Sequence, residues 1–331
     1  MMHTPETHPA RKRRGFTLVE LITAMAITAI LVLIIMQLTN QSVTLWKVMQ
    51  EDTSSSVTAR MALQTLSRDL ESFQVRSGSG TFQWLYAEVD EAMSGVPRGM
   101  NIPKSARCIF YVCAPDRNPS VSSGSSLRNT YRDIRANNID TQGDVSAVGY
   151  RLMFRDQILN IPGKNGDVTT FPLFSLYRQV LSPRDTYDYM LGRDDLKASY
   201  ARFEGNDDKN FLCENIVELS LIFNVEYPDV SSSTNNNQPT YRSLSVPILS
   251  TTARKGKSRF RLFGDRAFTD GEEMESAHIV SAELCITVLT EEGVALVEQV
   301  RLGQRRPPKL QDFFSRYTRS YTRAVSLPLP L

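Results

Sequence analysis

Glu20 is the only charged residue between Phe16 and Trp46, and it is preceded by four basic residues (11–14) and Gly15. A carboxylate within an apolar run costs about 3 kcal/mol to insert into a membrane, so such an acid is by default a functional residue. The chemistry that it offers is pairing with a positive charge in apolar surroundings. The alternative is that Glu20 lies near the membrane interface and extends its carboxylate into water.

The apolar run from Leu21 to Trp46 is long enough to cross a bilayer, since about 20 helical residues at about 1.5 Å each span a core of about 30 Å. The basic cluster ahead of it predicts a cytoplasmic N-terminus. A cleaved signal peptide also begins with basic residues, but its apolar core has only about 7–15 residues and a small-x-small cleavage site follows it. The sequence has neither feature and therefore predicts a retained single-pass anchor.

The sequence GFTLVE at positions 15–20, followed by the apolar run, resembles the processing motif of type IV pilins and pseudopilins. In that family a prepilin peptidase cuts after the glycine, which implies cleavage between Gly15 and Phe16 and N-methylation of Phe16. Glu20 then becomes the fifth residue of the mature chain. The resemblance implies that its carboxylate pairs with the N-terminal amine of a neighbouring subunit during assembly.

The same resemblance implies a set of partners and a location. The partners are the prepilin peptidase, other pseudopilins or minor pilins, the inner-membrane assembly platform and membrane lipid. The location is the inner membrane, with a cytoplasmic N-terminus, a periplasmic C-terminal domain and extraction into a pseudopilus.

Composition describes an ordinary globular protein behind this N-terminal segment. The chain has 331 residues, of which 41% are hydrophobic and 22% charged, and a formal net charge of +2. The leader through Gly15 holds four basic residues and one acid, Glu6, and contributes +3, which leaves the remainder near −1. The basic balance belongs to the leader and gives no support for a nucleic-acid partner.

A second helical pattern follows the apolar run. Apolar residues recur at spacings of three and four at Ala59, Leu63, Leu66, Leu70 and Phe73. The residues predicted to face water are Arg60, Gln64, Arg68, Asp69 and Glu71. We predict one helix from about Thr17 to about Phe73, weakened at Thr53–Ser56 and ended by Gly78 and Gly80. The alternative is a membrane helix followed by a separate soluble helix.

Beyond Gly80 the hydrophobic period changes to two, which is typical of half-buried antiparallel strands. Three runs alternate clearly, at 148–154, 217–225 and 280–288. Weaker strand candidates lie at 83–87, 107–113, 173–181, 244–249, 259–263 and 294–301. Glu291-Glu292-Gly293 is predicted to form a hairpin turn, and 114–144 and 228–242 are predicted to be long polar loops.

These patterns predict an α+β fold, with one long N-terminal helix packed on an antiparallel sheet. The predicted parts are a leader (1–15), a membrane-spanning helix (16–45), a soluble helix (46–78) and a β-rich periplasmic domain (79–331). This layout resembles the pilin fold. Patches at 148–152, 176–178 and 214–219 resemble the J-type minor pseudopilin of type II secretion, and the chain is also similar to the Verru_Chthon cassette protein C family.

Residues for catalysis are sparse in the predicted outer domain. His278 is the only histidine outside the leader, and no Gly-x-Ser-x-Gly or Walker motif is present. We therefore predict a structural subunit and no enzyme. The alternatives from other classes are a minor pilin of a DNA-uptake or adhesion pilus and a membrane-anchored periplasmic enzyme.

Three further features have ordinary explanations that we favour. The acidic turns 192–195 and 204–208 lack EF-hand spacing, so solvated turns are favoured over calcium sites and no cofactor is expected. The basic, aromatic region from Arg301 to Arg323 could contact DNA or an acidic subunit, but a tail that packs its aromatics on the sheet with its arginines outward is favoured.

The cysteines form no Cys-x-x-Cys pair, and their pairing cannot be read from the sequence. They are Cys108, Cys113, Cys213 and Cys285.

Overall fold

The computed structural model describes residues 17–78, 81–90, 93–113, 145–204, 210–229, 240–249 and 259–328. Gly15 and Phe16 lie outside these ranges, and so do the predicted loop 114–144 and most of the predicted loop 228–242. The chain divides into two compact units, Met1–Glu51 and Asp52–Leu331. We call the second one the folded unit.

Helix α1 (Leu18–Glu71) is continuous over 54 residues and contributes to both units. It passes without a break through the polar cluster Thr53–Ser56, so the prediction of one helix, and not two, is confirmed. Its end at Glu71 comes before Gly78, which the sequence predicts to end it, and Gly80 lies outside the described residues.

The early end of α1 has its cause in the sheet. The backbone N–H of Gln74 donates to the carbonyl of Tyr111 at 2.9 Å, and the N–H of Cys113 donates to the carbonyl of Ser72 at 2.9 Å. Pairing with a neighbouring strand therefore replaces the helical hydrogen bonds directly after Glu71. A contact that is remote in sequence ends this helix, without a glycine cap.

The buried face of α1 follows the predicted spacing. Its apolar side chains with an exposed fraction of 5% or less are Ala59, Ala62, Leu63, Leu66 and Leu70, and Phe73, just beyond the helix, is buried as well. The prediction is wrong for one of the residues expected to face water, because Asp69 is fully buried. It lies three residues after Leu66 and one before Leu70, on the apolar side of the helix.

The described strands are β1 (Leu85–Val89), β2 (Ala106–Val112), β3 (Ser146–Asp156), β4 (Ile161–Pro162), β5 (Leu173–Val180), β6 (Phe211–Glu214), β7 (Ile216–Pro228), β8 (Tyr241–Ile248), β9 (Arg259–Phe263), β10 (Arg266–Thr269), β11 (Glu273–Glu275), β12 (His278–Leu289) and β13 (Thr318–Ser326). The shorter helices are α3 (Pro183–Asp185), the π-helical turn η2 (Thr186–Met190), α4 (Leu196–Ala201), α5 (Glu291–Arg301) and α6 (Leu310–Tyr317).

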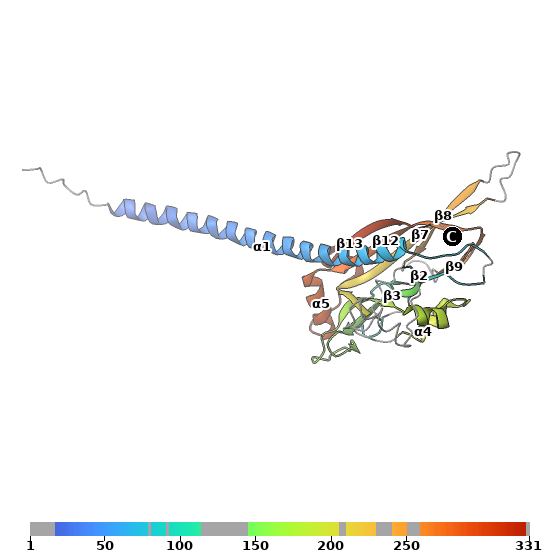
Figure 1. Cartoon of the computed structure of the whole chain (residues 1–331). Helices are drawn as coiled ribbons and strands as arrows, with labels where there is room; N and C mark the ends of the chain where they lie inside the picture. Colours follow the sequence, from blue (N-terminus) through green and yellow to red (C-terminus); the bar gives the residue numbers. More distant parts are fainter. Residues whose placement is uncertain are drawn as a thin grey trace, which may run out of the picture. The chain divides into compact units, whose positions relative to one another are not determined.

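The strands form two antiparallel sheets (Figure 1). A nine-stranded sheet has the order β11-β10-β9-β1-β2-β3-β5-β6, with β4 paired to β3, and a four-stranded sheet has the order β13-β12-β7-β8. Side chains from both sheets and from the C-terminal part of α1 share one hydrophobic core. The predicted α+β layout, a long N-terminal helix with antiparallel sheet, is thus confirmed and is consistent with a pilin-like fold.

The three clear alternating patterns correspond to β3, β7 and β12, with one local departure. Val280 is 37% exposed although its pattern predicts burial, whereas Ile279 is buried. The pairing of β12 with β7 shifts register between Ile279 and Ser281. A bulge there turns the side chains of the preceding residues to the opposite faces.

The strand predicted at 294–301 and the hairpin turn predicted at 291–293 are both wrong, because these residues form α5. The hydroxyl of Thr290 accepts the N–H of Gly293 at 3.2 Å and caps the helix. Residues 293, 296, 297 and 300 are buried, which is the period of a helix. A run rich in Val and Leu is compatible with either a strand or a helix. Here the cap at Thr290 favours the helix.

The C-terminal region is more ordered than a tail packed on the sheet. Phe313 in α6 is buried, and β13 pairs with β12 along its full length, from Thr318 to Ser326. Arg301, predicted to point outward, is buried with an exposed fraction of 2%. Its guanidinium finds internal acceptors, described below, which is the condition for burying an arginine.

Candidate assembly site

Glu20 lies in the first turn of α1 and takes part in the hydrogen bonds that begin the helix. The N–H and the hydroxyl of Thr17 both donate to Glu20 Oε2, each at 3.0 Å. In return the N–H of Glu20 donates to Thr17 Oγ1 at 3.3 Å. This reciprocal arrangement is a capping box, which satisfies N–H groups that the start of a helix leaves open. It explains why α1 begins at this position.

The carboxylate of Glu20 keeps capacity for a second partner. Both hydrogen bonds that it accepts end on Oε2, and among the described residues Oε1 has no hydrogen-bond partner. The side chain is exposed. A cation from another chain can therefore approach Oε1 while Thr17 stays bound.

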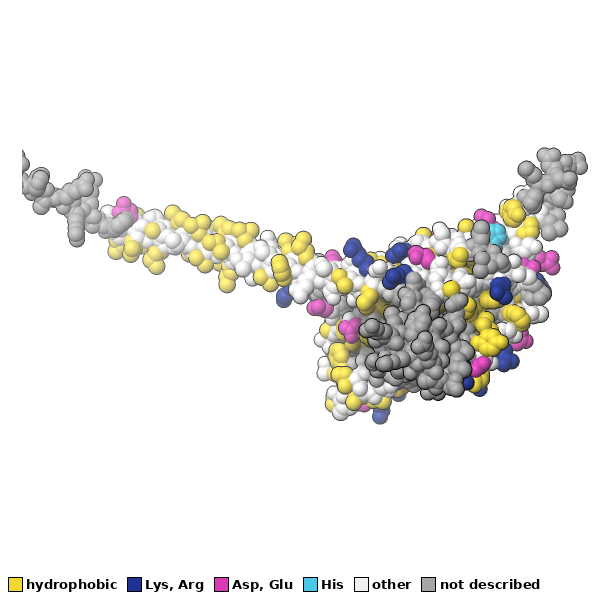
Figure 2. All heavy atoms as spheres, in the orientation of Figure 1, with side chains coloured by type: hydrophobic (Ala, Val, Ile, Leu, Met, Phe, Trp, Pro, Cys, Tyr) yellow, Lys and Arg dark blue, Asp and Glu magenta, His cyan; other side chains and the backbone are white. Residues whose placement is uncertain are grey.

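The surroundings of Glu20 are apolar and unburied within this chain. The large hydrophobic side chains from Leu18 to Trp46 are each at least 48% exposed. Figure 2 shows hydrophobic side chains along this stretch of α1. By length and composition α1 is the one helix in the described ranges that could cross a membrane. Such a surface requires lipid or other apolar helices around it.

The structure thus describes one of the three predicted site residues. Glu20 is placed at the start of α1, whereas Gly15 and Phe16 lie outside the described residues. The pairing of Glu20 with a neighbouring subunit remains a prediction.

Asp69 is a second acid of α1, and the prediction that it faces water missed its role. Its carboxylate accepts hydrogen bonds from Arg178 Nε at 2.7 Å and Nη2 at 3.0 Å, and from the hydroxyl of Tyr150 at 2.5 Å. Burial alone would lower the pKa of Arg178, but its bond to Asp69 raises that pKa above its usual value. Burial and the charge of Asp69 raise the pKa of Tyr150 well above its ordinary range. Arg178 and Tyr150 therefore keep their protons, and the group fastens the end of α1 to β3 and β5.

The position of Asp69 on the helix is the signal that could have identified it as a buried residue. It follows Ala62 by seven residues and Leu66 by three, so it falls on the buried stripe. A charged residue at such a position predicts a buried partner of opposite sign. The identity of that partner, Arg178, depends on sheet pairing and could not be read from spacing.

His278 does not lie in a catalytic arrangement among the described residues. It stands opposite Glu226 on the paired strands β12 and β7, with 3.7 Å between His278 Nε2 and Glu226 Oε2. No hydroxyl or thiol is hydrogen-bonded to this ring in the described part of the chain, as a nucleophile would be.

The acidic turns serve local structure where they are described. Asp195 caps α4 by accepting the N–H of Ala198 at 2.9 Å. Glu204 forms an ion pair with Arg107 and lies 3.6 Å from Arg151, and residues 205–209 are outside the described ranges. Within those ranges no three His, Cys, Asp or Glu side chains gather as metal ligands would. The expectation that these turns are solvated and hold no calcium stays an untested prediction.

All four cysteines are free thiols. Cys108 and Cys213 are buried, and burial raises the pKa of each thiol to about 12. Cys285 is half-buried and burial raises its pKa too, whereas Cys113 is exposed. Thiols with such raised pKa values are poor nucleophiles at neutral pH.

Residues 10–36 match the prokaryotic N-terminal methylation motif. The match includes Gly15, Phe16 and Glu20 and extends into the apolar part of α1. No curated protein and no solved structure matches the chain. The motif indicates a type IV pilin-like or pseudopilin-like precursor that a prepilin peptidase processes and that assembles with other pilins. It points to a structural role and to a membrane anchor at the N-terminus.

Proposed function

We propose that this chain is a minor pseudopilin, a structural subunit of a type II secretion or type IV pilus-like filament or its tip complex. The observation that supports it is the methylation motif at residues 10–36, which leads into a helical stretch with exposed apolar side chains. The prepilin peptidase cuts between Gly15 and Phe16 on the cytoplasmic side, and the new amine of Phe16 is methylated. The folded unit lies in the periplasm, and the inner-membrane assembly platform extracts the subunit.

Glu20 guides assembly in this proposal. Its free oxygen Oε1 receives the N-terminal amine of a neighbouring subunit, while Oε2 continues to cap Thr17. The attraction is strong because both charges are surrounded by apolar side chains, and each charge is costly there without the other. The chain carries out no reaction of its own, and its folded unit supplies contacts to other subunits.

Intact mass and N-terminal sequence of the membrane-extracted protein test the processing step. The protein is expressed with and without a prepilin peptidase. A chain that begins at methylated Phe16 only when the peptidase is present supports the proposal. An uncut chain, or cleavage after Trp46, contradicts it, and Gly15→Leu serves as the uncleavable control.

The assembly role is tested by Glu20→Ala in the cell that produces the filament. We expect normal membrane insertion and cleavage but loss of the subunit from sheared filaments. Thr17→Val is the matched control, because it removes one hydrogen bond to Oε2 and leaves the carboxylate in place. Normal incorporation of Glu20→Ala would contradict the pairing mechanism.

A further inference from the structure

Three loops of the folded unit meet at the end of α5, and we call their surface the loop face. The segments are 93–104, 157–172 and 302–312. The N–H of Arg98 donates to Asn165 Oδ1 at 3.2 Å. Gly99 lies so close to Pro307 that a Cβ added at Gly99 would be 2.9 Å from the proline ring. Segment 93–104 is thus in direct contact with both of the others.

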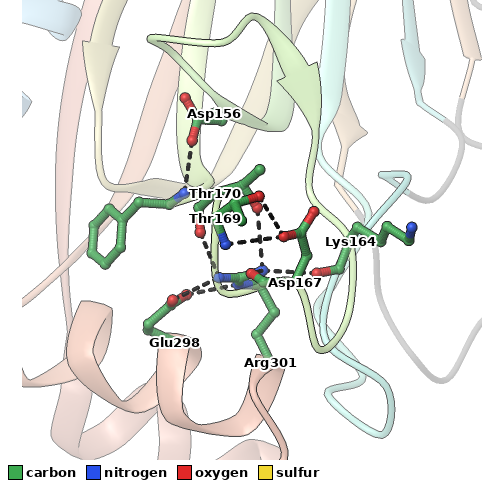
Figure 3. Close-up of polar contacts among 8 residues, drawn as sticks. Asp156, Lys164, Asp167, Thr169, Thr170, Glu298 and Arg301 are labelled. Atoms are coloured by element: carbon green, nitrogen blue, oxygen red, sulfur yellow. Dashed lines mark hydrogen bonds and ion pairs between the residues drawn. The ribbon is translucent and has the colours of Figure 1, made fainter.

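Arg301 holds the middle segment in one conformation (Figure 3). Its side chain is fully buried and donates to the carbonyl oxygens of Lys164, Asp167 and Thr170 at 2.7, 2.7 and 2.6 Å. Glu298 pairs with the guanidinium through both oxygens, at 2.6 and 2.7 Å. A buried arginine with this many partners fixes the backbone around it.

Asp156 holds the same segment from the strand side. Its carboxylate accepts the N–H groups of Ile158, Leu159 and Phe171 at 2.8, 2.9 and 2.7 Å. Burial opposes the charge, but these hydrogen bonds keep the pKa of Asp156 below its usual value. Two buried charged groups, Arg301 and Asp156, therefore organise a segment whose own side chains contribute little to the core.

That segment exposes large apolar side chains. Their exposed fractions are 91% for Ile158, 52% for Leu159, 40% for Ile161, 79% for Val168 and 52% for Phe171. Hydrophobic side chains reach the surface of the folded unit below α5, with Lys or Arg beside them (Figure 2). Large exposed apolar side chains on one rigid segment are typical of a protein-binding or membrane-binding surface.

Charge distinguishes these two kinds of partner. The exposed basic residues of the loop face are Arg98, Lys104, Lys164, Arg305, Arg306 and Lys309. The acids of its segments are Asp167 and Asp312. A surface with an apolar centre and an excess of cations complements the anionic headgroups of a phospholipid bilayer.

A short connection joins the folded unit to the apolar run of α1. The folded unit begins at Asp52, whose carboxylate lies 3.1 Å from Arg319 Nε, two residues after α6 ends. The apolar run of α1 ends at Trp46, and residues 47–51 add only about 8 Å as helix. Such a short connection gives the folded unit a high effective concentration at the bilayer surface.

We propose that the loop face docks onto the anionic phospholipid surface of the bilayer that α1 enters. Val168, Ile158 and their apolar neighbours enter the headgroup region, and the basic side chains contact lipid phosphates. The docked subunit is held at the membrane until assembly removes it. This inference depends on insertion of α1, but on neither cleavage nor the pairing of Glu20.

Lipid quenching of a fluorophore tests the docking. The full-length chain with Cys113→Ser and Val168→Cys is labelled with an environment-sensitive dye and inserted into vesicles of phosphatidylcholine with phosphatidylglycerol. Spin-labelled lipids quench the dye where it contacts the bilayer. Ser243→Cys in β8, also exposed, is the matched control position. We expect quenching at position 168 to exceed that at 243 at least about threefold.

Charge reversal and lipid composition test the anionic component. Arg305→Glu with Arg306→Glu, or vesicles of phosphatidylcholine alone, should reduce quenching at position 168 toward the level at 243. Near-UV circular dichroism checks that this exposed pair of changes leaves the fold intact. Equal quenching at 168 and 243 in a chain that floats with vesicles overturns the docking while leaving the anchor intact. Strong quenching that charge reversal does not change overturns the anionic-lipid proposal, and failure to float overturns the anchor itself.

Discussion

Helix α1 carries one acid near each end, and the two acids have opposite environments. Glu20 is exposed, bonds only to Thr17 among the described residues, and stands among exposed apolar side chains. Asp69 is fully buried and bonds to Arg178 and Tyr150 from two strands. The same helical backbone thus packs on the protein's own core at its C-terminal end, whereas its N-terminal end exposes an apolar surface that requires an external apolar medium.

The comparison shows how an acid can be used in apolar surroundings. Asp69 has its counter-charge in the same chain, so it stabilises the fold of one subunit. Glu20 has a spare oxygen and no counter-charge in the described chain, so it can select a partner outside it. One acid is a structural residue and the other is a candidate for assembly, although both interrupt an apolar pattern.

Asp69→Ala should produce the largest loss of stability. It leaves Arg178 and Tyr150 buried without the carboxylate, and removing one partner of a buried pair costs about 3–5 kcal/mol. The free energy of unfolding of the full-length chain in detergent micelles, followed by near-UV circular dichroism, measures it. Glu20→Ala is the control and should leave this value unchanged. An equal loss for both variants would remove the contrast between the two ends.

Two leucines of α1 test the same contrast for apolar side chains. Leu66 is fully buried, whereas Leu31 is 52% exposed. Leu66→Ala should destabilise the folded unit by about 2–5 kcal/mol, because it leaves a cavity in the core. Leu31→Ala should leave that unfolding transition unchanged. If Leu66→Ala cost less than about 1 kcal/mol, the C-terminal part of α1 would not be an integral part of the core.

Thr17→Val should have a local effect at the start of α1. It removes the hydroxyl of the capping box, which is worth about 1 kcal/mol to a helix. Amide hydrogen exchange of residues 18–21 in micelles should become faster, and exchange in β3 and β7 should stay the same. Unchanged exchange at 18–21 would mean that Glu20 is not engaged as a cap.

The smallest expected effect on stability is at Glu218. This acid is partly buried and, unlike Asp69, forms no ion pair among the described residues. Burial raises its pKa, which a hydrogen bond from Ser220 only partly offsets. A raised pKa means that the folded state binds the proton more tightly. This stabilisation is therefore complete below the pKa of Glu218 in the unfolded chain, about 4.3, and is lost as the pH rises through its pKa in the folded state.

Glu218→Gln should consequently weaken the fall in stability between pH 4 and pH 7. Urea unfolding of both proteins at several pH values in this range measures the difference. Glu214→Gln, on β6, the strand that precedes β7 in the chain, is the control for loss of a negative charge. An identical pH dependence of Glu218→Gln and the unmodified chain would show that the burial of Glu218 has no energetic consequence.

Some features could be predicted because they depend on neighbours in sequence. The spacing of Ala59, Leu63 and Leu66 defines a buried helix face, and the alternation in 217–225 defines β7. Local rules were insufficient at 291–301, where a hairpin turn (291–293) and a strand (294–301) were predicted and α5 formed. The cap at Thr290 was present in the sequence, but a run rich in Val and Leu satisfied both periods.

Remote contacts account for the other differences. Arg301 seemed part of an outward basic tail, yet the carbonyl oxygens that it binds come from residues 164–170, more than a hundred positions earlier. The end of α1 at Glu71 depends on the pairing of Gln74 with Tyr111. Neither partner can be found from spacing, because loop closure brings together residues whose separation in sequence carries no periodic signal.

The sequence by itself determined the N-terminal part of this protein. A basic leader, Gly15, Phe16, Glu20 and a long apolar run match the methylation motif and predict a membrane helix, since both depend on residue type at short, fixed spacing. Only the tertiary structure decided which partners Asp69 has, that Arg301 is an internal charge and that three separate segments meet at the end of α5. The physical reason is that burying a charge requires partners, and the fold brings those partners from distant strands and loops.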